Sequence, residues 1–232
     1  MIEGQRVLAV IPARGGSKGI PRKNLRVIAG RSLLEWTWRA AQGSAFLDRT
    51  ILSSEDPEII AAMRALGGDV PFVRPAELAA DTTPGIDPLL HALDAVPERY
   101  DLVVLLQPTS PLRTAADIDG AIRLCVERGA PACVSVGPVG KSPHWTYRLH
   151  EDARLSPILP PIEGAARRQD LPAYVTLNGA VYVARTDWIK QTRRFVAPET
   201  VAFLMSRESS VDVDDEIDLL VCQELLRRRL AT

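Results

Sequence analysis

The chain has 232 residues, of which 46% are hydrophobic and 25% charged, and its formal net charge at pH 7 is −1. This size and composition suit one large α/β domain, or a domain with a small insert, with enough apolar residues for a sizeable core. The near-neutral charge argues against broad binding to nucleic acid or to an anionic membrane surface. No apolar run is long enough to cross a bilayer and no signal peptide precedes Val7, so we expect a cytoplasmic protein.

The cysteines point to the same compartment. Cys125, Cys133 and Cys222 occur in no paired spacing, and the three histidines are also scattered. We expect the cysteines to be buried small hydrophobic side chains in a reducing compartment. The sequence therefore indicates neither a zinc site nor a disulfide framework.

The first informative stretch covers residues 7–24 and reads VLAVIPARGGSKGIPRKN. Its opening apolar run, residues 7–11, has the length and composition of a buried strand, which Pro12 ends. The loop behind it contains Gly15, Gly16 and Gly19, which free the backbone so that consecutive N–H groups can turn inward around an anion. Further charged and hydrogen-bonding side chains in the loop are Arg14, Ser17, Lys18, Arg22, Lys23 and Asn24. The combination predicts a site for a phosphate chain.

A chance basic turn and two familiar phosphate motifs fit this loop less well. A surface turn that is basic by chance does not need three glycines directly behind a buried strand. The pattern G-x-x-x-x-G-K-[ST] is absent, so Lys18 is not the lysine of a P-loop. The pattern G-x-G-x-x-G is absent as well, which disfavours a dinucleotide-binding Rossmann site and with it an NAD-linked enzyme.

The segment IPARGGSKGIPRKN closely resembles the signature of the acylneuraminate cytidylyltransferases, also called CMP-sialic acid synthetases. Those enzymes join CTP to a nine-carbon keto-sugar acid and release pyrophosphate. Further matches downstream extend the resemblance over most of the chain. The resemblance implies a nucleotide site made by Ala13, Arg14, Gly15, Gly16, Ser17, Lys18, Lys23 and Asn24, with Arg74 in a wall of the base pocket. Arg14, Lys18 and Lys23 are expected to be catalytic, because their charge would hold the triphosphate and offset the charge of the leaving group.

The next segments alternate between helix and strand signals. Ser32 and Glu35 form a capping-box pattern that opens a helix, and Asp56-Pro57 is typical of a second helix start, running to Leu66. Further strands are expected at residues 50–53, 70–73, 102–106 and 131–136, and further helices at residues 84–95 and around 118–125. The alternation predicts a Rossmann-like α/β fold, with a mostly parallel sheet covered by helices on both faces. Ligands of such sheets bind outside the carboxyl ends of the strands.

The fully apolar strand at residues 102–106 runs into the turn QPTSPLR, residues 107–113. A turn that only leads to the next helix, with Thr114 as its cap, explains the two prolines. It does not explain Gln107 just past a buried strand, and QPTSPLR matches the family motif in which the glutamine contacts the sugar acid. We therefore predict a sugar contact for Gln107 and keep a structural role open for Ser110 and Arg113.

An irregular segment follows at residues 138–172, which hold six of the 18 prolines. Such a run inside a compact domain is typical of an insert or a functional loop. The resemblance implies a small extended insert that pairs two subunits, between parts of a nucleotidyltransferase domain at residues 1–137 and 173–232. Lys141 and Arg168 would reach the sugar acid, since residues 168–172 match the family's RQ-x-L-P and a guanidinium binds a carboxylate bidentately. The alternative for the pair Arg167-Arg168 is a solvated edge.

Three more residues are expected in the sugar pocket from the resemblance. Asn178 and Tyr182 belong to NGAVY, which matches the family's NGAIY, although Tyr182 equally suits an ordinary strand aromatic. Phe195 lies where the family has an aromatic pair. Two features depart from the family: Val196 follows Phe195, and Thr176-Leu177 stand where a basic residue often precedes Asn-Gly.

Two aspartates near the carboxyl end indicate a metal. In extended chain Asp212 and Asp214 point to the same side, where two carboxylates repel unless a cation lies between them. Mg²⁺ prefers such oxygen ligands alongside substrate phosphates, so both are assigned to Mg²⁺ and Asp212 also to catalysis. Asp215 is expected to cap the closing helix. The buried stripe of that helix is predicted to be Ile217, Leu220, Val221 and Leu225.

The hypothesis that results is nucleotidyl transfer by a homodimer, from CTP to a nonulosonic, sialic-acid-like 2-keto-3-deoxy sugar acid. No side chain stands out as a general base. The same chemistry on an eight-carbon or a diamino sugar acid is the nearest alternative. The other alternative is a catalytically silent nucleotide-binding or regulatory protein. The intact pair of Asp212 and Asp214 weighs against this alternative.

Overall fold

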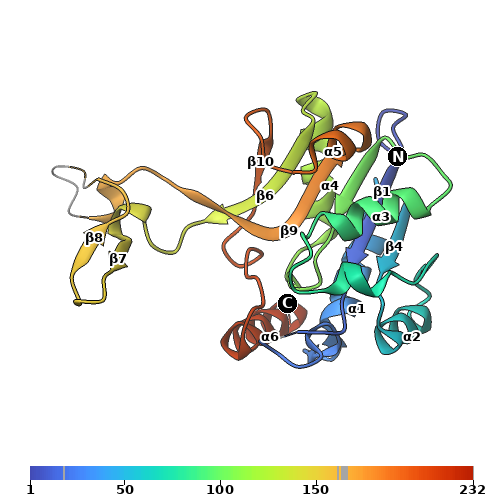
Figure 1. Cartoon of the computed structure of the whole chain (residues 1–232), viewed down its shortest axis with the longest axis horizontal. Helices are drawn as coiled ribbons and strands as arrows, with labels where there is room; N and C mark the ends of the chain where they lie inside the picture. The colour runs from blue at the N-terminus through green and yellow to red at the C-terminus, as the bar shows by residue number, and fades with distance from the viewer. Residues whose placement is uncertain (18, 161, 163–166, 232) are drawn as a thin grey trace.

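A six-stranded sheet forms the centre of the protein (Figure 1). The computed structural model describes residues 1–17, 19–160, 162 and 167–231. The strand order is β10-β6-β9-β5-β1-β4, with β1 parallel to β4 and β5, β6 parallel to β10, and β9 antiparallel to its neighbours β5 and β6. The bounds are β1 Val7–Pro12, β4 Arg49–Ser53, β5 Leu102–Leu105, β6 Ala132–Pro138, β9 Val175–Arg185 and β10 Val201–Leu204. The predicted mostly parallel sheet is confirmed.

Helices cover both faces of the sheet, as predicted (Figure 1). Alternate residues of β1 enter two separate core clusters, because successive side chains of a strand point to opposite faces. One face packs against α1 (Leu33–Gln42), α2 (Pro57–Ala65) and α4 (Ala115–Glu127), and the other against α3 (Asp87–Ala95) and α5 (Thr186–Thr192). The closing helix α6 (Glu216–Ala231) packs on a third cluster, around Ile20, Leu33 and Val213.

The local signals for helix starts are confirmed. The hydroxyl of Ser32 accepts the N–H of Glu35, the carboxylate of Asp56 accepts two N–H groups of α2, and Thr114 forms a capping box with Asp117. Asp215 caps α6, since its Oδ1 accepts the N–H groups of residues 217 and 218. These caps satisfy N–H groups that a helix leaves unpaired in its first turn, which is why short sequence patterns locate them.

The strand predicted at residues 70–73 is wrong. The chain makes only an isolated parallel bridge there, between Ile51 and Asp69, and β4 remains the edge of the sheet. Pro71 lacks the N–H group that a continued ladder needs. The short strands β2 (Val27–Ile28), β3 (Arg31–Ser32), β7 (Tyr147–Leu149) and β8 (Leu155–Pro157), as well as β10, were not predicted.

The predicted buried stripe of the closing helix is wrong for most of its residues, although Leu225 is half-buried and packs against the third cluster. Leu219, Cys222 and Leu226 are buried, whereas Ile217 is 70% and Leu220 65% exposed. The first three turns of α6 carry apolar residues around most of their circumference, so periodicity alone could not fix which face is buried.

All three cysteines are free and buried, as predicted. Among the residues that the structure describes, no helix combines the length and the apolar character that crossing a bilayer requires.

Between β6 and β9 the chain leaves the sheet and forms an arm (Figure 1). We use "arm" for the described residues between Val139 and Tyr174, which include the small sheet of β7 and β8 and project away from the rest of the molecule. The predicted insert at residues 138–172 falls on this segment. Its division from the domain and its pairing of two subunits stay predictions.

Arg113 holds the turn after β5 in place from inside the core. Its Nη1 donates to the carbonyl oxygens of Gln107, at 3.1 Å, and Ala180, at 2.7 Å, while Nη2 donates to Thr37 Oγ1 at 2.7 Å. Burial lowers the pKa of Arg113 to about 9, which leaves the guanidinium charged at neutral pH. Arg113 is therefore structural, the role that the sequence kept open for it.

Arg113→Met should destabilise the protein by about 3 kcal/mol or more, because it removes three hydrogen bonds of a buried group and leaves carbonyl oxygens unpaired. Urea unfolding followed by circular dichroism measures the change. The exposed Arg128 supplies the control, and Arg128→Met should shift the unfolding free energy by less than about 0.5 kcal/mol. Equal stability of the two variants would contradict this structural role.

Candidate active site

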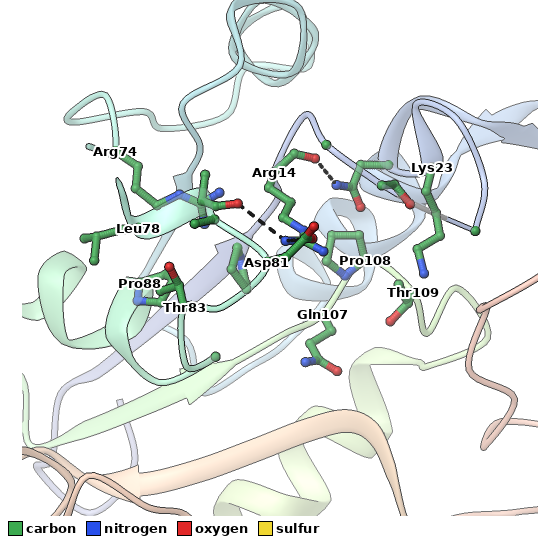
Figure 2. Close-up of a pocket in the computed structure, with 18 of the residues that line it drawn as sticks. Arg14, Lys23, Arg74, Leu78, Asp81, Thr83, Pro88, Gln107, Pro108 and Thr109 are labelled. Atoms are coloured by element: carbon green, nitrogen blue, oxygen red, sulfur yellow. Dashed lines mark hydrogen bonds and ion pairs between the residues drawn. The ribbon is translucent and has the colours of Figure 1, made fainter. Parts of the chain in front are cut away.

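A cavity of about 430 Å³ opens at the carboxyl ends of β1 and β5, where the sequence predicts ligand binding (Figure 2). Its walls come from the loop after β1, the segment before α3, the turn after β5 and the segment before α6. The residues that line the cavity include Arg14, Ser17, Lys23, Asn24, Arg74, Leu78, Asp81, Thr83, Pro88, Gln107, Thr109 and Asp214.

Hydrogen bonds to neighbouring segments fix the glycine-rich loop. The N–H of Ala13 donates to the carbonyl of Ser53 at 3.0 Å, and the N–H of Gly15 donates to Glu55 Oε1 at 2.7 Å. The side chain of Asn24 closes the loop by donating to the carbonyl of Arg14 at 2.9 Å. Ala13 and Asn24 thus support the loop, and Gly16 and Ser17 line the cavity. The predicted residue Lys18 lies outside the described residues.

Arg14 and Lys23, two of the three cations that were predicted to be catalytic, both line the cavity. Arg14 Nη1 lies 2.8 Å from Asp81 Oδ1, and Lys23 Nζ donates to the carbonyl of Val213 at 2.8 Å and to Asp214 Oδ1 at 3.3 Å. Both pairs have a solvent-exposed carboxylate, so each cation could exchange its carboxylate partner for a ligand anion at a modest cost in free energy.

The opposite end of the cavity is less exposed and more apolar. Arg74 is 3% exposed, and its Nη2 lies 2.5 Å from Glu55 Oε2. Leu78 and Pro88 stand beside it, on the other side of Arg14 from Lys23 in Figure 2. The cavity therefore has a cationic end and a more apolar end that carries one buried guanidinium. This arrangement is suited to a nucleotide.

The Asp212–Asp214 segment packs directly against the glycine-rich loop. A Cβ on Gly19 would lie 2.6 Å from the backbone oxygen of Asp214, so only glycine permits this approach. Burial raises the pKa of Asp212 and the charge of Asp214 adds to that effect, whereas a hydrogen bond from Thr109 and the charge of Lys23 oppose it. Both predicted metal ligands thus lie near Lys23 and the cavity.

Gln107 and Asp212 converge on Gly179 in strand β9. The backbone of Gly179 has φ 72°, and a Cβ there would lie 2.7 Å from Gln107 Oε1 and 3.4 Å from Asp212 Oδ2. Burial and the charge of Asp212 raise the pKa of Tyr182, whose ring centroid lies 5.2 Å from that of Phe195. Four residues from distant parts of the sequence, predicted for metal or sugar, are therefore grouped beside the cavity.

Asn178 has a different place from the one predicted. Its amide is buried, accepts from Ser135 Oγ at 2.6 Å and donates to Ser210 Oγ at 3.0 Å. The same amide oxygen accepts the N–H of Ala180 at 3.2 Å. This arrangement favours a supporting role, in which Asn178 holds the turn at Gly179, over direct contact with a ligand.

Lys141, one of the two predicted sugar residues of the arm, does not line the cavity of its own chain. Lys141 is exposed near the base of the arm. The backbone of Arg168 belongs to a short 3₁₀ turn, Arg168–Asp170, and its side chain lies outside the described part of the structure. Arg167 pairs with Asp170 within the same turn, at 3.2 Å.

Two residues at or next to the cavity were missed from the sequence, Glu55 and Asp81. Glu55 follows β4, at the same edge of the sheet as the glycine-rich loop. The rule that ligands bind at the carboxyl ends of parallel strands would have pointed to it. Asp81 carries no such signal, because it lies in an irregular segment whose path is set by tertiary contacts.

Comparison with known proteins identifies the relatives of this chain. Residues 8–148 match the family model described as cytidylyltransferase. The CMP-N,N'-diacetyllegionaminic acid synthase of Legionella pneumophila is 32% identical over 231 residues, which cover 95% of this chain and 96% of the relative. The N-acylneuraminate cytidylyltransferase of Escherichia coli O18:K1:H7 is 30% identical over 213 residues, 92% of this chain but 50% of the relative. The chain therefore spans about half the length of that enzyme.

Solved structures support the fold. A CMP:2-keto-3-deoxy-manno-octonic acid synthetase complexed with CTP superposes with a TM-score of 0.73 and 18% identity, over 97% of this chain and 99% of that one. The 4-diphosphocytidyl-2C-methyl-D-erythritol synthase of Anaerococcus prevotii gives a TM-score of 0.67 and 13% identity, over 97% and 100%. At these identities the likeness concerns the fold alone.

The family match and the named relatives show that this protein, with its mostly parallel α/β sheet and the glycine-rich loop that lines the cavity, is a nucleotidyltransferase. The chain belongs to the cytidylyltransferase family and resembles its acylneuraminate branch over nearly its whole length. The family relationship read from the glycine-rich loop is confirmed.

Gly179→Ala tests the convergence of Gln107 and Asp212. Gly67, with φ 75°, is the control, because a Cβ there meets no described atom within 4 Å. Each alanine should cost about 1–2 kcal/mol of stability through its left-handed backbone. Only Gly179→Ala should also slow nucleotidyl transfer, by about tenfold or more, since it displaces two groups of the site. Pyrophosphate release and thermal unfolding measure the two effects, and equal activity of both variants would count against the convergence.

Proposed function

We propose that this protein transfers the cytidylyl group of CTP to a nonulosonic, sialic-acid-like 2-keto-3-deoxy sugar acid, with release of pyrophosphate. The observation that carries the proposal is the cavity with Lys23 and Arg14 at one end and the buried guanidinium of Arg74 at the other. The cationic end suits a triphosphate, and the apolar end with Leu78 and Pro88 suits a pyrimidine base.

The acceptor would lie on the side of Gln107, away from the base. Gln107 lines the cavity and also approaches Gly179, so its amide would lie between the nucleotide and the group of Asp212, Tyr182 and Phe195. An amide can bond either hydroxyl or carboxylate groups. The aromatic rings offer a flat apolar surface for an acyl substituent of the sugar acid.

The names of the relatives support an acidic nine-carbon acceptor. The Legionella pneumophila relative is named for a diacetyllegionaminic acid and the Escherichia coli relative for N-acylneuraminate. A structure of similar fold is named for 2-keto-3-deoxy-manno-octonic acid, which keeps an eight-carbon acceptor as the second candidate. Val196 and Thr176-Leu177 depart from the sialic acid pattern, and this departure favours a nonulosonic acid other than the commonest sialic acid.

Mg²⁺ fits the residues present. The Oδ1 atom of Asp212 is buried and has no hydrogen-bond partner among the described residues, as expected for an oxygen that serves a cation. The described residues contain no group of three or more metal-ligating side chains, and Mg²⁺ in nucleotide enzymes commonly takes one or two carboxylates with substrate phosphates. Asp212 and Asp214 would hold the ion. When bound it would act as a Lewis acid on the phosphate and lower the pKa of the attacking hydroxyl.

The protein's own groups would supply positioning and charge. The anomeric hydroxyl oxygen forms a bond to the α-phosphorus while the bond from that phosphorus to the bridging oxygen of pyrophosphate breaks. Lys23 and Arg14 would offset the negative charge that gathers on the leaving group, and the amides of the glycine-rich loop would hold it. Gln107 would orient the acceptor so that its hydroxyl faces the phosphorus.

An acceptor panel tests the proposed function. The wild-type protein is incubated with CTP, Mg²⁺ and separate nonulosonic and eight-carbon keto acids, and products are identified by mass. We expect a CMP-sugar with a nonulosonic acid and much less with the eight-carbon acid. Asp212→Asn and Lys23→Met should lower turnover by about 100-fold or more with little change in melting temperature.

Lys190 and Asp94 provide matched controls, since they form an exposed ion pair at 2.6 Å far from the cavity. Lys190→Met and Asp94→Asn should keep wild-type turnover. If only the eight-carbon acid gave a product, that acid would take the place of the proposed nonulosonic acceptor. Turnover near wild type in Asp212→Asn would contradict the role given to Asp212.

The arm supports a homodimer as part of this proposal. It carries large apolar side chains on its surface, namely Trp145, Tyr147, Leu149, Leu155 and Ile158. Contiguous apolar surface of this kind marks an interaction site. A second copy whose arm packs against this one would also bring its Lys141 and Arg168 toward the acceptor, and Lys141 does not line the cavity of its own chain.

Leu149→Glu should shift the protein from dimer to monomer, because a charge would be buried in the pairing surface. Ile217→Glu is the control, since Leu149 and Ile217 are both 70% exposed and Ile217 lies on α6. Light scattering coupled to size exclusion measures the mass of each variant at several concentrations. A monomeric wild type, or a dimer that Leu149→Glu leaves intact, would contradict pairing through the arm.

A further inference from the structure

One carboxylate joins the two ends of the nucleotide cavity. Glu55 lies just past the carboxyl end of β4, with Oε1 accepting the N–H of Gly15 at 2.7 Å and Oε2 accepting from Nη2 of Arg74 at 2.5 Å. Gly15 belongs to the glycine-rich loop and Arg74 to the opposite wall. Glu55 is therefore the direct link between the groups that face the phosphates and the group that faces the base.

Arg74 is held firmly enough to present a fixed set of donors. Its side chain is 3% exposed, and its backbone N–H donates to the carbonyl of Ser54 at 2.9 Å, next to the residue that binds its guanidinium. Its Nε is buried and has no protein partner in the described part of the chain. Since Arg74 lines the cavity, this guanidinium has donor capacity beyond its contact with Glu55.

The ion pair also changes what Arg74 can recognise. An unpaired guanidinium in a buried position would attract any anion, including a misplaced phosphate. The ion pair of Arg74 and Glu55 has no net charge as a whole and still offers directed N–H donors, which suits a neutral ring with acceptors. Cytosine presents two adjacent acceptors, O2 and N3, whereas N3 of uracil carries a hydrogen and would oppose a donor.

We propose that Glu55 is a positioning residue that sets the preference of this site for cytosine over uracil. It would do so by holding the guanidinium of Arg74 at a fixed place relative to the amide of Gly15, so that the base wall and the phosphate loop match one nucleotide. This inference rests on the proposed function, because it takes the cavity to be the CTP site.

Calorimetric titration with CTP, UTP and inorganic tripolyphosphate, each with Mg²⁺, tests it. Glu55→Gln keeps an amide oxygen for the N–H of Gly15 but removes the charge that holds Arg74. We expect CTP binding to weaken by about tenfold or more and the CTP-to-UTP preference to fall at least about fivefold. Tripolyphosphate, which has no base, should lose less than about threefold in affinity, because the charges at the phosphate end are unchanged.

Glu98 supplies the matched control. Its carboxylate also pairs with an arginine, Arg49 Nη1 at 2.7 Å, but at the amino end of the same strand β4. Glu98→Gln should leave all three affinities within about twofold of wild type, the change expected of an exposed ion pair. A residue that only supported the fold would alter CTP, UTP and tripolyphosphate alike, so the base preference separates positioning from stability.

The outcomes distinguish this inference from the function on which it rests. Selective CTP binding that Glu55→Gln leaves unchanged would overturn the role of Glu55 alone. Binding of neither CTP nor UTP by the wild type would overturn both. If Glu55→Gln fails to fold, the double variant Glu55→Gln with Arg74→Met removes the unpaired buried charge, and it should bind CTP and UTP weakly and equally. A double variant that still prefers CTP would contradict the proposal.

Discussion

The burial of residues 7–11 of β1 and the pairing of this strand on both sides constrain the rest of the site. β1 is parallel to β4 and to β5, so three strands end at one edge of the sheet. The N–H of Ala13 continues the ladder to the carbonyl of Ser53 beyond the last strand residues, which fixes where the glycine-rich loop begins. Glu55 and Gln107 follow the neighbouring strands at the same edge. Groups separated by up to about 90 residues thus meet without a long ordered loop, as open parallel sheets generally allow.

Three cation–carboxylate pairs among the described residues around the cavity differ in how easily a ligand anion can replace the carboxylate. Asp81 and Asp214, the partners of Arg14 and Lys23, are 46% and 80% exposed, so these pairs are screened by water and exchange readily for a ligand anion. The pair of Arg74 and Glu55 is 3% and 20% exposed, and separating it would leave a charge buried without a partner. The end with Arg14 and Lys23 is therefore adaptable, while the end with Arg74 keeps one arrangement.

What the sequence could predict was decided by the range of the interaction involved. Helix caps such as Asp56 and apolar strands such as β5 depend on neighbours within a few residues, and these predictions are confirmed. The buried face of α6 depends on where Asp215 and the Val213 cluster place the helix, and residues 70–73 depend on whether the sheet accepts another strand. The hydrophobic periodicity could predict neither the buried face of α6 nor the state of residues 70–73. In each case several faces or strand pairings satisfy the same local pattern.

The motifs on the acceptor side show why a pattern match does not by itself separate contact from support. In QPTSPLR, Gln107 lines the cavity, while the equally matched Arg113 is buried and holds the backbone of that turn. In NGAVY, the amide of Asn178 forms internal hydrogen bonds. Gly179 has no Cβ, and this lets Gln107 and Asp212 lie close to its backbone. A family-like motif preserves a geometry, and the burial and partners of each residue decide which of its members that geometry presents to a ligand. For this reason the glycine-rich loop alone could predict a phosphate site, because backbone amides and cations act there directly, whereas separating the roles of Gln107, Arg113 and Asn178 required the fold.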